Sequence, residues 1–88
     1  MTTNSERTMS FEPNWKPLEA LLTPEQCGNF MFMGTVLNLD GTAIHLYKHR
    51  NTRRYLNLDA TGKTYEFVDF GKPYVEVDRE TAIARVTK

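Results

Sequence analysis

The segment with the clearest capacity for chemistry is a short basic run near the middle of the chain. Four cations and a histidine occupy seven consecutive positions without an acidic residue, and a tyrosine lies at each end. These residues are Tyr47, Lys48, His49, Arg50, Arg53, Arg54 and Tyr55. Basic groups can hold phosphates while aromatic rings stack on bases, and a cationic hairpin tip can equally dock on an acidic protein surface. The remaining interpretation is a solvated turn whose charges pair with Asp59, Glu66 and Asp69.

Two histidines, His45 and His49, lie four residues apart. On a β-strand this spacing places both side chains on one face, about 13 Å apart along the chain. The ligands of one zinc ion lie much closer together, and a zinc site usually has three or four of them. We therefore expect no metal site and no cofactor. A small enzyme with a pocket beside His45 or His49 is kept as one of three functional hypotheses.

Two other segments contain reactive residue types without the context that chemistry needs. Cys27 is the only cysteine, so the sequence predicts neither an intrachain disulfide nor a multi-cysteine zinc site. The tripeptide Gly62-Lys63-Thr64 matches the end of a phosphate-binding loop, but no glycine precedes it at the required spacing. It also lies between two predicted strands rather than before a helix. The sequence therefore nominates no catalytic residue.

Composition limits the classes of function. The 88 residues fit one domain, and 11 basic residues balance 11 acidic ones. A net charge of zero argues against a protein whose main task is to coat nucleic acid or an anionic membrane. The longest apolar stretch, Phe30-Met31-Phe32-Met33, is too short to span a bilayer, and the N-terminus has no apolar leader segment. We expect a cytoplasmic protein without a membrane partner.

These residues are positioned by a predicted α+β domain over residues 14–88, preceded by a flexible tail over residues 1–13. Helical spacing predicts a short helix over residues 15–22, and Thr23-Pro24-Glu25-Gln26 has the residues that start a second one. Alternating apolar residues and turn signals then predict a four- to five-stranded antiparallel β-meander, which could curl toward a partial barrel. Its strands are residues 31–39, 42–49, 53–59, 64–70 and, for the fifth, 74–77. Asp78 is the predicted cap of a short C-terminal helix, with a strand over residues 82–87 as the alternative.

The register of the meander decides which side chains share a face. A three-residue turn over Arg50-Asn51-Thr52 pairs Leu46 with Leu56, which gathers the leucines on one face as the core. The opposite face then mixes polar and aromatic side chains. Its predicted members are Phe32, Val36, His45, Tyr47, His49, Arg53, Tyr55, Asn57, Glu66, Val68 and Phe70.

The preferred hypothesis is a small non-enzymatic binding or accessory module. It would engage a protein partner, which could be a second copy of itself, through the polar–aromatic face and the basic tip. The alternative is that the tip, Lys48 to Arg54, binds nucleic acid or a phosphorylated ligand together with Tyr47 and Tyr55.

Overall fold

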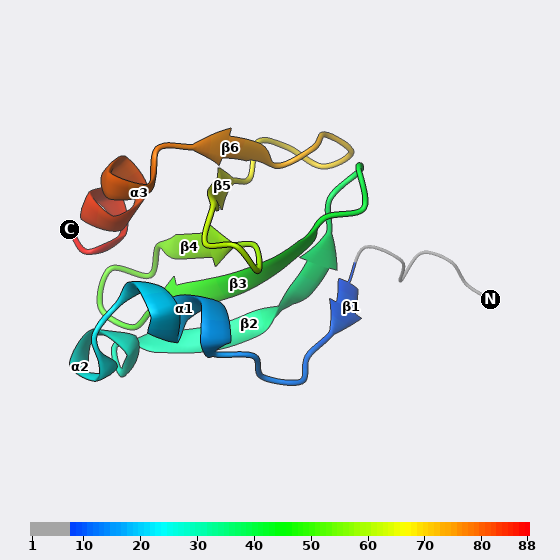
Figure 1. Ribbon diagram of the computed structural model, residues 1–88. Coiled ribbons are helices and arrows are strands. Elements are labelled where there is room, and N and C mark those ends of the chain that lie inside the picture. Colours follow the sequence, from blue (N-terminus) through cyan, green and yellow to red (C-terminus); the bar gives the residue numbers. More distant parts are fainter. Residues whose placement is uncertain (1–7) are drawn as a thin grey trace.

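A computed structural model describes residues 8–88 of the chain. Within these residues six strands follow one another in the order β1 to β6, each antiparallel to the next, and three short helices accompany them (Figure 1). The strands are β1 (Thr8–Ser10), β2 (Phe30–Leu37), β3 (Ala43–His49), β4 (Tyr55–Leu58), β5 (Thr64–Glu66) and β6 (Val75–Val77). The helices are α1 (Lys16–Leu21), α2 (Pro24–Cys27) and α3 (Arg79–Val86). The predicted α+β architecture is confirmed.

The meander has one strand more than the sequence predicted. Strand β1 pairs with β2 and lies inside the segment expected to be a flexible tail. The first seven residues of that segment lie outside the described part of the chain, and the flexibility of the tail stays a prediction. At the other end, the chain after Asp78 forms the predicted helix and not the alternative strand. Asp78 is its N-cap, and Asp78 Oδ2 accepts the backbone N–H of Thr81 at 3.0 Å.

Local sequence also explains the second helix. Thr23 Oγ1 accepts the backbone N–H of Gln26 at 3.2 Å, and Gln26 Oε1 accepts the backbone N–H of Thr23 at 2.9 Å. This reciprocal capping box starts α2, and Pro24 occupies its first position, where a missing N–H has no cost.

The predicted register of β3 is wrong by one residue. Tyr47 pairs with Leu56, and Leu46 pairs with Asn57. The turn is longer than expected: the N–H of His49 donates to the carbonyl of Arg54, and Arg53 adopts the left-handed conformation at φ 66°. A shift of one residue exchanges the two faces of a strand.

A β-bulge also shifts the pairing between β2 and β3. The register changes between Phe32 and Gly34, and Gly34 has φ 123°, a conformation that glycine tolerates best. Beyond the bulge, Leu37 pairs with Ala43, and Val36 pairs with Ile44.

The core lies between the sheet and the helices. Its buried apolar side chains are Leu18, Phe30, Tyr47, Leu56, Leu58 and Val86. Tyr47 is completely buried, its hydroxyl donates to the carbonyl of Asn14 at 2.6 Å, and its ring lies 5.6 Å from that of Trp15. The predicted polar–aromatic face is therefore, on β3, the face that the helices cover.

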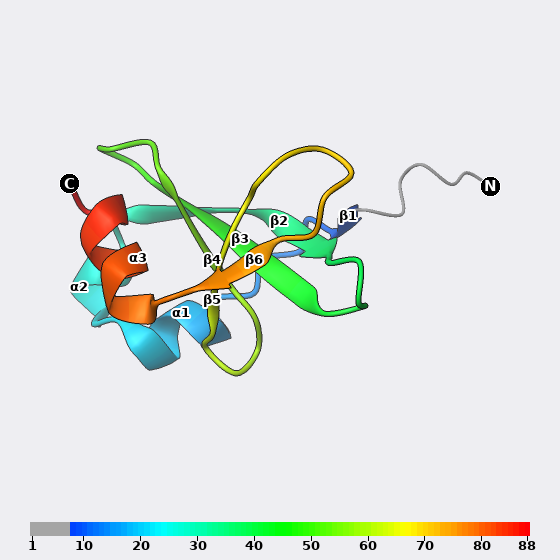
Figure 2. The same cartoon turned by 90° about the horizontal axis from the view of Figure 1, so that it is seen from above.

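The opposite side of the sheet is partly covered by the connection between β5 and β6. Figure 2 shows α1 and α2 on one side of the sheet and this connection reaching over the other. Asn38 Nδ2 donates to the carbonyl of Tyr74 at 3.2 Å, and the N–H of Tyr74 donates to Asn38 Oδ1 at 2.8 Å. These bonds draw the sheet into a curl, which stays open because β1 and β6 are its two edges.

Candidate functional site

A cavity of about 570 Å³ opens where β4 and β5 diverge. The two strands share only the pairs Asn57–Tyr65 and Leu58–Thr64, whereas β5 stays paired with β6 as far as Glu66. Toward Tyr55, β4 therefore has no β5 neighbour. Most side chains around the cavity are aromatic or aliphatic; they are Leu46, Tyr55, Leu56, Tyr65, Phe67, Tyr74, Val77 and Ala82. This concave and largely apolar lining is typical of a binding site.

The lining also contains three charged side chains: Arg54, Glu66 and Arg85. Arg85 and Glu66 form an ion pair at 3.2 Å and both are half-exposed. Arg54 takes part in no ion pair within residues 8–88. Beside it, Lys48 Nζ lies 5.8 Å from the centre of the Tyr55 ring, close enough for a cation–π contact. The charge around the mouth of the cavity is therefore positive.

Asn57, one of the lining residues, carries an unsatisfied polar atom. The side chain is only 5% exposed, and its Nδ2 donates to the carbonyl of Tyr65 at 3.2 Å. Its Oδ1 is buried and has no hydrogen-bond partner within the described part of the chain. An unpaired buried acceptor typically costs about 1–3 kcal/mol. Asn57 is therefore the one feature of the lining that a stable core alone does not explain.

The loop between β5 and β6 forms an exposed aromatic wall next to the cavity. The rings of Phe67 and Phe70 lie 5.3 Å apart, and those of Phe67 and Tyr74 lie 5.7 Å apart, in edge-to-face arrangements. Phe70 is 87% exposed. Contiguous exposed apolar groups beside a pocket commonly mark an interaction surface.

The structure divides the site residues predicted from the sequence into two groups. Arg54 and Tyr55 line the cavity, and Lys48 lies over the Tyr55 ring. Tyr47 and His49, by contrast, are buried on the opposite face. A partner cannot contact Tyr47 in this structure, and neither residue belongs to the exposed surface around the cavity.

The other two predicted cations lie away from the cavity. Arg50 is exposed, and its Nε donates to the carbonyl of Gly28 at 3.2 Å. Arg53 is exposed in the left-handed position of the turn. The tip forms no ion pair with the predicted acidic neighbours Asp59, Glu66 and Asp69 in the described residues. Glu66 pairs with Arg85.

The basic tip is held in place by hydrogen bonds to His49 and to α3. His49 Nδ1 accepts the N–H groups of Asn51 and Thr52, each at 3.2 Å. Thr52 Oγ1 donates to the carbonyl of Val86, the last residue of α3, at 2.6 Å. The tip is therefore an ordered element rather than a loose turn.

His45 is absent from the lining of this cavity and from the linings of two smaller ones, one between α1 and the β4–β5 turn and one between that turn and the start of α3. Its Nδ1 is 2.8 Å from Thr35 Oγ1, and it is buried. Burial lowers the pKa of His45, although the nearby carboxylate of Asp59 opposes this effect. Because His49 is also absent from the cavity linings, the pocket that the enzyme hypothesis places beside the histidines is not found among these cavities.

Asp59 organises the turn between β4 and β5. Its Oδ1 accepts the N–H groups of Thr61 and Lys63, and its Oδ2 accepts the hydroxyl of Tyr65 at 2.9 Å. Burial alone would raise the pKa of Asp59, but these hydrogen bonds outweigh it and the pKa is lowered. Burial and the Asp59 carboxylate together raise the pKa of Tyr65 to about 12. This network positions Tyr65 in the cavity lining.

Within the described residues, no cluster of three or more histidine, cysteine, aspartate or glutamate side chains could hold a metal ion. Over the same part of the chain, no helix is long and apolar enough to cross a membrane.

Sequence reasoning missed much of the cavity. Tyr65, Phe67, Tyr74 and Arg85 all line it, and none of them is among the site residues that the sequence predicts. Asn57 offered a signal, because asparagine is depleted in strand interiors and lies here between two leucines.

No protein-family model, curated protein or solved structure matches this chain.

Proposed function

We propose that this chain is a small non-enzymatic module that binds an acidic segment of a protein partner. The partner would place an apolar anchor in the cavity between β4 and β5 and its acidic side chains against Arg54 and Lys48. The observation that carries the proposal is the combination of an apolar cavity with a cation, Arg54, that has no ion-pair partner in residues 8–88.

The composition of this surface supports a protein partner. Tyrosine, phenylalanine and arginine are enriched where proteins bind one another, and an apolar pocket surrounded by a polar rim is typical of the centre of an interface. Phe67 of the cavity lining is exposed, and so are Val68, Phe70 and Val75 in the chain segment that follows it, which adds apolar surface. Because the whole chain has no net charge, the attraction of an acidic partner would be local to this rim.

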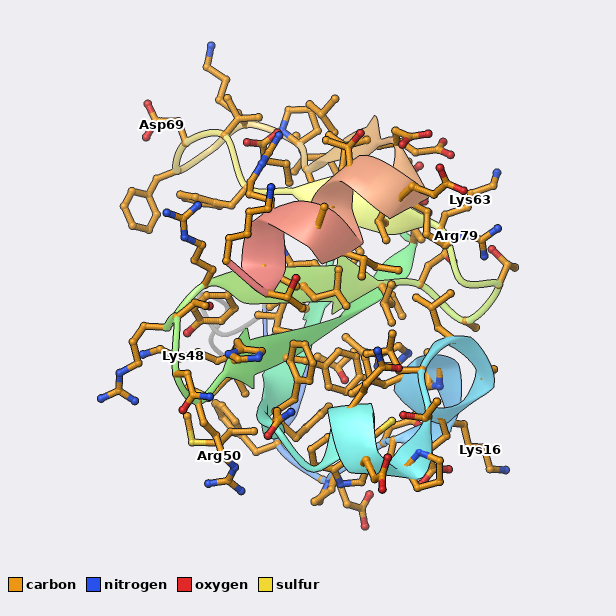
Figure 3. All side chains as sticks on the ribbon, turned by 90° about the vertical axis from the view of Figure 1, so that its left-hand side faces the viewer. Lys16, Lys48, Arg50, Lys63, Asp69 and Arg79 are labelled. Carbon is orange, nitrogen blue, oxygen red and sulfur yellow. The ribbon has the colours of Figure 1, made fainter. Side chains whose placement is uncertain are left out.

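The test compares charge reversal at two sites. Arg54 belongs to the basic tip, as do Lys48 and Arg50, which lie toward one edge of the molecule in Figure 3. Arg79 lies with Lys63 toward the other edge and is therefore the control site. Peptides from a random displayed library are selected on the whole protein and then measured on Arg54→Glu and on Arg79→Glu. We expect Arg54→Glu to weaken binding about tenfold or more and Arg79→Glu to leave it unchanged. Equal effects of the two substitutions would contradict the proposed site.

Binding of single-stranded nucleic acid or of a phosphorylated ligand is the second candidate. The contact of Lys48 with the Tyr55 ring, next to Arg54, favours it, because cations and exposed rings together hold phosphates and bases. Such binding would weaken steeply as salt concentration rises. A single-stranded oligonucleotide that binds more tightly than every selected peptide, with this salt dependence, would replace the protein partner in our proposal.

The proposal also covers the identity of the partner and the location of the protein in the cell. The partner could be a second copy of this chain, and sedimentation at increasing concentration separates that case: a Phe67→Glu variant should then lose the dimer. We also propose a cytoplasmic location, which cell fractionation with an antibody to the chain would test.

A further inference from the structure

The unpaired Oδ1 of Asn57 restricts what the cavity can hold. The amide nitrogen of Asn57 already donates to the carbonyl of Tyr65 at 3.2 Å, which sets the orientation of the amide. The oxygen is left as a buried acceptor without a donor in the described residues. A ligand that brings a hydrogen-bond donor to this atom removes the cost of the unpaired acceptor and gains affinity.

The charges and the apolar lining exclude most side chains as that donor. Arg54 lines the cavity without an ion-pair partner in the described residues, and the acidic lining residue Glu66 is already paired with Arg85. A lysine or arginine from the partner would therefore meet like charge. Serine, asparagine and glutamine have little apolar surface for the aromatic lining, and their own acceptors would be buried without partners.

Tryptophan satisfies all of these conditions. The indole ring has one N–H donor and no acceptor on a large apolar body. Tyrosine also donates, but its hydroxyl has lone pairs that would need donors in turn. The cavity has a volume of about 570 Å³, which is in the range of sites that bury whole small-molecule ligands. An indole ring is smaller than such ligands and therefore fits.

We propose that the cavity is an anchor site for a tryptophan of an acidic partner segment, with its indole N–H donating to Asn57 Oδ1. This inference rests on the proposed function, since it names the anchor that the partner supplies. Asn57 Oδ1 is buried before binding, so neighbouring side chains must move for the indole to reach it. Among the lining side chains, Tyr55 and Phe67 are each 46% exposed and are therefore the least constrained by packing.

The experiment uses the peptides selected on the whole protein. We expect them to contain tryptophan with neighbouring aspartate or glutamate. One such peptide is then synthesised again with benzothienylalanine, in which sulfur replaces the indole N–H with little change in shape. Wild-type protein should bind this analogue about tenfold more weakly than the tryptophan peptide. An Asn57→Leu variant, shown to be folded by its amide spectrum, should bind both peptides equally.

The outcomes distinguish a failure of the tryptophan anchor from a failure of the proposed function. Peptides that need Arg54 but lack tryptophan would overturn the anchor and leave the proposed function in place. Equal binding of the two peptides by the wild-type protein would do the same, whatever the stability of the Asn57 variant. Peptides that bind Arg54→Glu as well as wild type would overturn both.

Discussion

Tyr47 lies directly opposite Leu56 in the β3–β4 ladder, and both side chains are buried beneath the helices. This pairing places the largest fully buried side chain of the described residues at the centre of the core. It also turns Leu46 and Asn57 toward the other face, where both line the cavity.

The first prediction concerns Tyr47. Replacing it with alanine should lower the free energy of unfolding by about 3–5 kcal/mol, because a buried ring is lost and a void remains. Tyr47→Phe should cost only about 1 kcal/mol, since it removes the hydroxyl bond to Asn14 and keeps the ring. Urea unfolding followed by tryptophan fluorescence measures both. A Tyr47→Ala protein as stable as wild type would mean that Tyr47 lies on an exposed face.

The second prediction concerns acid sensitivity through His45. Burial lowers the pKa of its imidazole below the ordinary value of 6.5. The unfolded chain then binds a proton more readily than the folded one. The stability contribution of neutral His45 is therefore complete above pH 6.5 and is lost as the pH falls through the folded-state pKa. One such group changes stability by at most about 1.4 kcal/mol per pH unit.

Urea unfolding at a series of mildly acidic pH values checks this dependence. A His45→Gln variant serves as the control and should show a shallower dependence over the same range. A wild-type protein that becomes more stable on acidification would contradict the burial of a neutral imidazole.

The third prediction concerns Asp59. An Asp59→Ala variant should lose about 2 kcal/mol of stability, because the turn N–H groups and the Tyr65 hydroxyl lose a charged acceptor. Since the pKa of Asp59 is lowered below 3.8, the wild-type advantage should be present above that pH and disappear as the pH falls below it. Unfolding of both proteins at neutral and acidic pH gives the comparison. A stability difference that is independent of pH would argue against a charged acceptor.

The fourth prediction concerns Thr52, which joins the basic tip to α3. Thr52→Val should cost about 1 kcal/mol and raise amide exchange in the last turn of α3, because the bond to the carbonyl of Val86 is lost. Thr81→Val, at the start of the same helix, is the control and should leave exchange in that last turn unaffected. Unchanged exchange in Thr52→Val would show that packing alone holds the tip.

The fifth prediction concerns Glu66, the acidic member of the cavity lining. Glu66→Gln removes the only negative charge among the lining residues and frees Arg85, so acidic peptides should bind about two- to fivefold more tightly. Its stability should change little, because half-exposed ion pairs contribute weakly. Isothermal titration with a selected peptide measures the effect, and Glu19→Gln on α1 is the matched control. Weaker binding by Glu66→Gln would indicate a cationic ligand.

The elements that depend on local sequence were predictable. Thr23 and Asp78 cap helices at the positions that their neighbours in sequence indicated. The strands β2 to β6 overlap the segments predicted from alternation and turn residues. Each of these signals acts within a few residues, so no tertiary information is needed to find them.

The register was not predictable in the same way. It depends on Arg53 taking a left-handed conformation, which arginine rarely adopts. It also depends on a bulge next to Gly34, for which the glycine was a signal that the predicted register did not use. The leucine pattern favoured pairing Leu46 with Leu56, because it did not count Tyr47 as a core residue. Arg54 and Tyr55 were still identified, since the charge run is visible in sequence. Tyr74 and Arg85 join them only because the chain curls over the sheet.

The two hydrogen bonds between Asn38 and Tyr74 close a ring of chain without any covalent crosslink. They join points 36 residues apart, and β3, β4, β5 and the basic tip all lie on the ring between them. The entropy lost on closing such a ring grows only with the logarithm of its length. The turns within it could therefore lengthen or shorten among related chains while Tyr74 stays in place as part of the cavity lining.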